Sequence, residues 1–100
     1  MKTSELTGAA LDWAVAVAEY GYGADYKTNR YSTDWAQGGP IIERERICPC
    51  PSSHAVGSPW SATDFTGHIT HFGPTPLIAA MRCYVASKLG DEIDLPKELT

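Results

Sequence analysis

The sequence has no excess of positive charge. Its 100 residues contain 8 Lys and Arg against 12 Asp and Glu, so the formal net charge is −4. The chain has only four arginines, at Arg30, Arg44, Arg46 and Arg82. No basic face is long enough to neutralise many phosphates of a nucleic-acid backbone. The composition therefore argues against a DNA or RNA polymer as a partner.

Long apolar runs and catalytic motifs are also missing. The alanine-rich stretch 9–18 is interrupted by Asp12, and Ser4, Glu5 and Thr7 stand where a signal peptide would be apolar. We therefore expect a cytoplasmic protein that does not associate with a membrane. The sequence has no G-x-S-x-G, H-E-x-x-H or P-loop pattern. This absence favours a non-enzymatic protein without a cofactor.

Cysteine is scarce, with three residues in the whole chain. The number is odd, and Cys48 and Cys50 are separated only by Pro49, so we expect reduced thiols and no disulfide framework. Structural zinc sites usually space two cysteines by two to four residues. We therefore predict no metal site. The residues that keep zinc open as an alternative are Cys48, Cys50, His54, His68 and His71.

Two segments have helical periodicity. Apolar residues recur with helical spacing between Leu6 and Tyr20, which predicts a helix over 5–20 that Ser4 caps and Gly21 ends. A second helix is predicted over 76–89, with Thr75 as its N-cap, Pro76 in its first turn and Gly90 after its end. Cys83 is expected to be a small buried apolar residue. The predicted core residues are Trp13, Val17, Leu77, Met81, Tyr84 and Val85.

The middle of the chain lacks this periodicity. Segment 21–40 is rich in glycine and aromatic residues and is predicted to be a long binding loop, and 40–47 is predicted to be a strand. Segment 48–66 is predicted to be an exposed, variable excursion, with one or two short strands within 60–72 and another in 91–96. The chain is thus expected to be one α+β domain over residues 1–100. Two helices would pack on one face of a mostly antiparallel sheet.

Glycines, prolines and arginines together suggest a site for an anion. The start of the helix at 76 has unpaired amides at Leu77 and Ile78, and the guanidinium of Arg82 can reach back to the same ligand. Gly38 and Gly39 would let the backbone approach that ligand, and aromatic rings would stack on a base. The predicted ligand site consists of Trp35, Gly38, Gly39, Pro40, Arg44, Arg46, Gly73, Thr75, Leu77, Ile78 and Arg82.

A purely structural alternative stays open for the same residues. Gly73, Pro74 and Pro76 can simply fix a sharp helix start, with Arg82 paired to an acidic neighbour. The pair Gly38 and Gly39 can equally form a tight hairpin. In that case Arg44 and Arg46 would pair with Glu43 and Glu45 on neighbouring strands.

Three blocks of the sequence resemble a known family. They are "MKTSELTGAALDWAVA", "STDWAQGGPIIERERI" and "GPTPLIAAMRCYVASKLGDEIDLPKEL", and they are similar to the NinX-like small proteins of tailed phages and prophages, a domain of unknown function. The resemblance covers nearly the whole chain, while 48–66 departs from the family pattern. It implies a phage accessory protein in an infected or lysogenic bacterial host, and it brings no catalytic residues.

Three functional hypotheses follow from the residues and the resemblance. The first is a non-enzymatic protein that binds, and by analogy sequesters, a small nucleotide-like anion to counter host antiphage signalling. The second is an interaction module that docks on a host or phage protein through its Tyr-rich loop, which is segment 21–40 together with Tyr20. The third is an enzyme acting on a nucleotide. A homo-oligomer is compatible with each of them.

Overall fold

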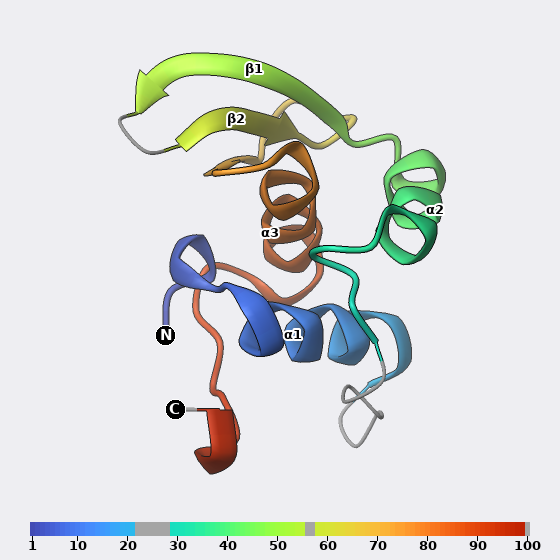
Figure 1. Cartoon of the computed structure of the whole chain (residues 1–100), viewed down its shortest axis with the longest axis vertical. Helices are drawn as coiled ribbons and strands as arrows, with labels where there is room; N and C mark the ends of the chain where they lie inside the picture. The colour runs from blue at the N-terminus through green and yellow to red at the C-terminus, as the bar shows by residue number, and fades with distance from the viewer. Residues whose placement is uncertain (22–28, 56–57, 100) are drawn as a thin grey trace.

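The computed structural model describes residues 1–21, 29–55 and 58–99 (Figure 1). It contains α-helices and one antiparallel sheet, so the predicted α+β class is confirmed. None of the helices in the described ranges is both long and apolar enough to cross a membrane. The elements are η1 (Thr3–Glu5), α1 (Gly8–Tyr20), α2 (Trp35–Glu45), β1 (Cys48–Ala55), β2 (Ser58–Thr63), β3 (Thr70–Gly73), α3 (Pro76–Leu89) and η2 (Lys97–Leu99).

The strands lie side by side in sequence order, with β2 in the centre. The prediction of short strands within 60–72 is confirmed by β2 and β3. Segment 48–66, expected to be an exposed excursion, is mostly strand, because 48–55 and 58–63 belong to the sheet. Pro49 and Pro51 had indicated a loop, but β1 is an edge strand, and an edge strand tolerates proline.

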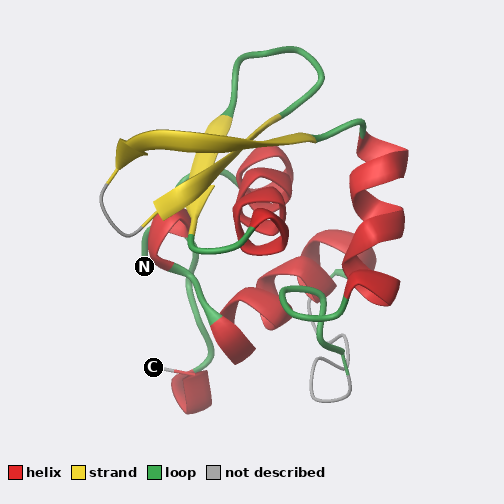
Figure 2. Ribbon diagram, turned by 45° about the horizontal axis from the view of Figure 1, so that its top comes forward, coloured by secondary structure: helices red, strands yellow, loops and turns green. Residues whose placement is uncertain are grey.

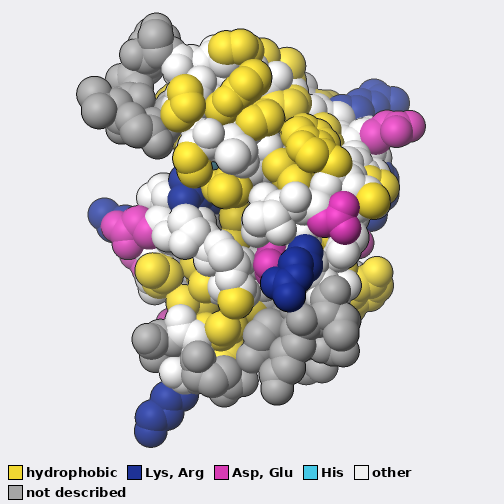
Figure 3. Space-filling model, viewed as in Figure 1, with side chains coloured by type: hydrophobic (Ala, Val, Ile, Leu, Met, Phe, Trp, Pro, Cys, Tyr) yellow, Lys and Arg dark blue, Asp and Glu magenta, His cyan; other side chains and the backbone are white. Residues whose placement is uncertain are grey.

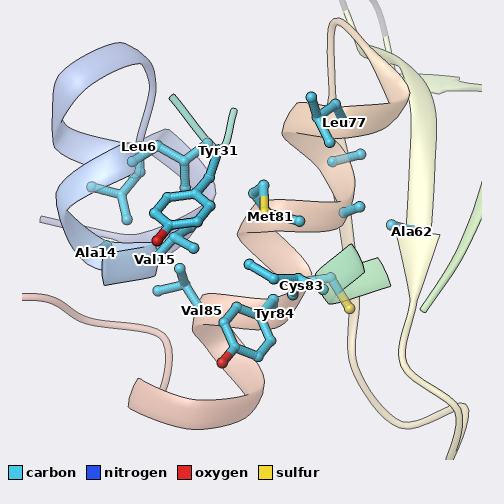
Figure 4. Packing of buried hydrophobic residues seen from close by; sticks show 14 of the residues in the cluster. Leu6, Ala14, Val15, Tyr31, Ala62, Leu77, Met81, Cys83, Tyr84 and Val85 are labelled. Atoms are coloured by element: carbon cyan, nitrogen blue, oxygen red, sulfur yellow. The ribbon is translucent and has the colours of Figure 1, made fainter. Parts of the chain in front are cut away.

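Helix α3 lies between the sheet and α1 (Figure 2). Its residues 79–86 are all buried, so it is covered all round rather than along one stripe. Figure 4 shows Ala62 of the sheet on one side of α3 and Val15 of α1 on the other. Both long predicted helices therefore lie on one face of the sheet, and α3 separates α1 from the strands. All six predicted core residues are buried.

The ends of α1 and α3 match the local signals in part. Gly21 and Gly90 follow the two helices, as predicted, with φ of 89° at both. Thr7 rather than Ser4 occupies the N-cap of α1, because residues 3–5 form the separate 3₁₀ helix η1. The predicted strand over 91–96 is wrong. Only one bridge forms, between Lys2 and Glu92, because the partner segment enters η1 immediately after Lys2.

The largest departure from the sequence prediction is α2. Residues 35–45 were expected to be loop and strand, yet they form a helix that includes Gly38, Gly39 and Pro40. The Asp34 carboxylate caps this helix by accepting a hydrogen bond from the Ala36 amide at 2.9 Å. Arg46, in the left-handed conformation at φ 56°, ends it. Tertiary packing here overrides weak helix propensity.

Candidate functional site

The starts of α2 and α3 border a hollow of about 190 Å³, here called the α2–α3 hollow. Trp35 belongs to the first turn of α2, and Thr75 is the N-cap of α3. Four residues of the predicted ligand site meet here, together with two that the prediction missed. The lining residues are Ser32, Thr33, Trp35, Thr75, Leu77 and Ile78.

A buried carboxylate fixes the segment that precedes α2. Asp12 of α1 is 4% exposed. One of its oxygens accepts hydrogen bonds from the Ser32 amide at 2.9 Å and from the Ser32 hydroxyl at 2.7 Å. Such charge-assisted bonds are the stronger kind. The wall of the hollow at Ser32 and Thr33 is therefore held against α1.

Gly38 allows α2 to approach α3 closely. A Cβ at this position would lie 2.5 Å from the Tyr31 carbonyl oxygen and 2.6 Å from Leu77 Cδ1. Only glycine fits such a contact without movement of its neighbours. Gly39 faces outward, and its nearest atom would be Trp35 Cε3 at 3.8 Å. The glycine pair therefore serves helix packing, and only Gly38 is sterically required.

Two amides at the start of α3 already have acceptors. The Ile78 amide donates to Thr75 Oγ1 at 3.1 Å, and the Ala79 amide donates to the Thr75 carbonyl at 3.0 Å. A Cβ at Gly73 would lie 2.8 Å from the Ala79 amide nitrogen, so β3 passes close to the helix start. The premise that the Ile78 amide is free for an anion is therefore wrong.

Arg82 does not line the hollow. Its side chain is buried, with Nε donating to the Leu6 carbonyl at 2.9 Å and Nη1 to the Phe72 carbonyl at 2.7 Å. Burial lowers the pKa of this guanidinium from its usual value. Neither alternative from the sequence, a shared anion or an acidic neighbour, matches these contacts. Arg82 instead joins the N-terminal segment to β3.

Arg44 and Arg46 lie at the opposite end of α2. The Arg44 guanidinium pairs with Glu19 and Glu45, and Tyr84 Oη donates to Glu19 at 2.6 Å. Burial acts to raise the pKa of Glu19, but hydrogen bonds from Arg44 and Tyr84 leave that pKa below its usual value. Arg46 is exposed at the C-cap. Both arginines are thus separated from the α2–α3 hollow by the length of the helix.

Residues 2–88 match the sequence model of the family described as Bacteriophage P22, NinX. The chain belongs to this family. No curated protein matches it. The match to the NinX family confirms the resemblance seen in the sequence, and it includes the whole α2–α3 hollow.

Within this NinX family domain, the Tyr-rich loop is described only in part. Tyr20 is 73% exposed, whereas Tyr31 is buried at 7% and belongs to the core. Tyr22 and Tyr26 lie outside the described residues. Docking through this loop therefore stays a prediction.

The predicted metal alternatives are mostly kept apart. In the described ranges, no three His, Cys, Asp or Glu residues are grouped as metal ligands would be. His68 is exposed, and His71 lies 4.0 Å from Asp91. The His54 side chain is outside the described part of the structure. Cys48 and Cys50 do lie together, with 3.4 Å between their sulfur atoms.

The two lining residues that the prediction missed, Ser32 and Thr33, stand next to a helix-start signal in the sequence. Asp34 is followed three positions later by Gln37, which is the spacing of an N-cap and its partner at the start of a helix. In the structure Gln37 Nε2 donates to Asp34 Oδ2 at 3.1 Å. Recognising this pair would have placed a helix start at Trp35. Ser32 and Thr33 would then have been expected beside it.

Proposed function

We propose that this NinX family protein is a non-enzymatic phage accessory protein that binds a host or phage protein at the α2–α3 hollow, in the cytoplasm of an infected or lysogenic bacterium. The observation that carries the proposal is Trp35, a residue that is 52% exposed beside the buried Leu77. Tryptophan is among the residues that most often dominate the binding energy of protein interfaces. An exposed tryptophan next to a hollow is well placed to receive a partner.

The size and floor of the hollow favour an apolar side chain as its occupant. Pockets for small molecules usually have a volume of about 300–1,000 Å³, and the α2–α3 hollow has about 190 Å³. Leu77 and Ile78 supply apolar surface, and the hydroxyl-bearing Thr33 and Thr75 stand around it. One or two side chains of a partner protein would fill this space beside the Trp35 ring.

The charges near the hollow argue in the same direction. Asp34 and Thr75 already accept hydrogen bonds from the amides of the two helix starts. Asp34 also places a negative charge there, while Arg82 and Arg44 are bound elsewhere. An anion would therefore find fewer free donors than the sequence suggested.

A nucleotide-like anion is the second candidate, and Trp35 is again the observation that favours it. An exposed indole stacks readily on a nucleobase, and two helix starts supply partial positive charge. In this version the protein sequesters a signalling nucleotide and counters host antiphage defence. An enzyme acting on that nucleotide ranks third, because the sequence has no catalytic motif to support it.

Affinity capture from a phage-infected lysate tests the first proposal. Wild type, Trp35→Ala and the matched exposed-aromatic controls Phe65→Ala and Tyr20→Ala are compared by quantitative mass spectrometry. We expect one protein to be lost specifically with Trp35→Ala, with affinity falling at least ~30-fold, the size expected for a hot spot. Loss with Tyr20→Ala instead would move the interface to the Tyr-rich loop.

Calorimetry with mono-, di- and cyclic nucleotides separates the second candidate from the first. If the protein-interaction proposal is right, none of these compounds gives heat with wild type or with Trp35→Ala. Heat of binding that is present in wild type and absent in Trp35→Ala would favour the nucleotide over a protein as the ligand of the hollow. Chemical change of the nucleotide after incubation would indicate the enzyme.

A further inference from the structure

Strand β1 carries two exposed thiols on one face. Cys48 and Cys50 are two positions apart on the strand, so their side chains project to the same side. Their Sγ atoms are 3.4 Å apart. Pro49, between them, pairs with Ala62, which is buried against α3. The two thiols therefore lie on the outer face of the sheet, away from the core.

The described residues that lie opposite the thiols in the strand register are uncharged. In the strand register Thr63 lies opposite Cys48 and Ser61 opposite Cys50, with Phe72 next to Ser61 on β3. Figure 3 shows hydrophobic side chains, a class that includes Pro and Cys, gathered at the top of the view over β1, while Lys and Arg are scattered. No carboxylate or imidazole of the described residues joins the two sulfur atoms as a third ligand.

The third cysteine has the opposite environment. Cys83 is fully buried in α3, and burial raises the pKa of its thiol to about 12. Because the thiolate is the reactive form, Cys83 is expected to be inert. The hydrogen bond shared with Cys48 raises the pKa of the Cys50 thiol, because it favours the protonated form of Cys50. The molecule thus contains two accessible thiols, Cys48 and Cys50, and one buried thiol, Cys83, that serves as an unreactive control.

We propose that Cys48 and Cys50 form a thiol–disulfide exchange site that reacts with low-molecular-weight disulfides. One thiolate attacks a sulfur of the disulfide, forms a mixed disulfide and expels one thiolate of the small molecule. The second cysteine, deprotonated, then attacks the protein sulfur of that mixed disulfide, closes the Cys48–Cys50 bond and expels the other small thiolate. The protein loses two electrons and two protons, and the small disulfide becomes two thiols.

The spacing of the pair makes the closed form easy to reopen. A strand advances about 3.3 Å per residue, so the two Cα atoms are separated by about 6.6 Å, near the upper end of the ~4.4–6.8 Å range of disulfides. Disulfides that are strained and exposed are the labile ones. Pro49 further limits relaxation of the backbone. The site is therefore suited to exchange rather than to permanent cross-linking.

The test uses glutathione redox buffers, acid trapping and intact-mass measurement on the full chain. We expect wild type to lose two hydrogen atoms in mass and two reactive thiols together, with Cys83→Ser behaving in the same way. Cys48→Ser and Cys50→Ser should each stop at a mixed disulfide with one glutathione. In the native protein the exposed pair should react with a thiol reagent at least ~10-fold faster than Cys83.

Other products would overturn the inference. Two glutathiones on one wild-type chain would show that the second cysteine does not attack the mixed disulfide. Covalent dimers would show that exchange occurs between chains instead. Equal reactivity of the pair and Cys83 would remove the basis of the site. Circular dichroism of both serine variants confirms that these exposed substitutions leave the fold intact.

Discussion

Helices α2 and α3 begin side by side, but different interactions stabilise them. Helix α3 has a threonine cap, a proline in its first turn and a glycine after its end, and its bounds are those predicted from the sequence. Helix α2 contains Gly38, Gly39 and Pro40, each of which lowers helix propensity. It is nevertheless a helix, because Asp34 caps it and Ile41 is buried in the core. Local signals define α3, whereas contacts made elsewhere in the fold define α2.

The largest expected effect concerns the buried cation of α3. Arg82→Ala removes two hydrogen bonds from a charged donor to the carbonyls of Leu6 and Phe72. We expect the free energy of unfolding to fall by about 3 kcal/mol, since such bonds contribute about 1.5–3 kcal/mol each and part of this is recovered by hydration. Urea unfolding measures the loss.

Arg82→Lys refines this test. Lysine keeps the charge but has no planar fork to reach both carbonyls, so it should recover less than half of the lost stability. An unchanged urea midpoint in both variants would show that Arg82 does not hold the N-terminal segment to β3. A Trp35→Ala protein, changed only at an exposed position, is the control for stability.

The second expectation separates the two glycines of α2. Gly38→Ala should lower the free energy of unfolding by about 1–3 kcal/mol, because the new methyl group overlaps the Tyr31 carbonyl and Leu77. Gly39→Ala, in open surroundings, should raise it by about 0.5–1 kcal/mol through helix propensity. Thermal melts of the two variants decide the matter. Equal changes would mean that α2 is not packed against α3 as described.

The third expectation concerns the proline within α2. Pro40 has no amide hydrogen, so it cannot donate the helical bond to the Ala36 carbonyl one turn before it. Pro40→Ala should restore that bond and raise the free energy of unfolding by about 1 kcal/mol, after the larger entropy of the unfolded chain is subtracted. Denaturant titration of Pro40→Ala beside Gly39→Ala provides the measurement. A loss of stability would show that the ring itself packs usefully.

The smallest expected effect is a pH dependence at the strand before α3. Burial lowers the pKa of His71 from 6.5, although Asp91 partly opposes this. The unfolded chain therefore takes up a proton at a higher pH than the folded chain does. Stability should fall as the pH drops from 6.5 towards the folded pKa, and rise again as the pH increases through the same window.

Unfolding in urea at a series of pH values, with wild type and His71→Gln, isolates this contribution. The variant should have a flatter profile in that window. The lowered pKa of Glu19 gives a loss of stability of the same sign, but that loss begins near pH 4.5, whereas the loss from His71 begins near pH 6.5. A wild-type profile that is as flat as the variant's would rule out His71 as its source.

A structural feature could be predicted from the sequence where the residues that cause it are close together in the chain. Thr75, Gly21 and Gly90 act within their own turns, so the start of α3 and the C-terminal ends of α1 and α3 could be predicted. The partners of Arg82 are 76 and 10 residues away, at Leu6 and Phe72, and no pattern in the sequence connects them.

The candidate site shows the same division. Trp35, Thr75, Leu77 and Ile78 were predicted to lie together, and they do line one hollow. Arg44 was misplaced because the segment that carries it was taken as extended. A helix sends its two ends in opposite directions, and Arg44 is at the end far from the hollow. The wrong prediction of a strand in place of the second half of α2 thus put Arg44 at the predicted site.

The contacts of the N-terminal segment have a consequence for the order of synthesis. The Thr3 hydroxyl donates to the Gly90 carbonyl at 2.7 Å, and the Thr3 amide donates to the Asp91 carbonyl at 2.8 Å. Residue 3 leaves the ribosome before its partners, which lie after α3. Until α3 emerges, α1 has no core to cover and its apolar face stays open to chaperones. This small domain is therefore expected to complete its fold only after translation has passed α3, however quickly the separate helices form.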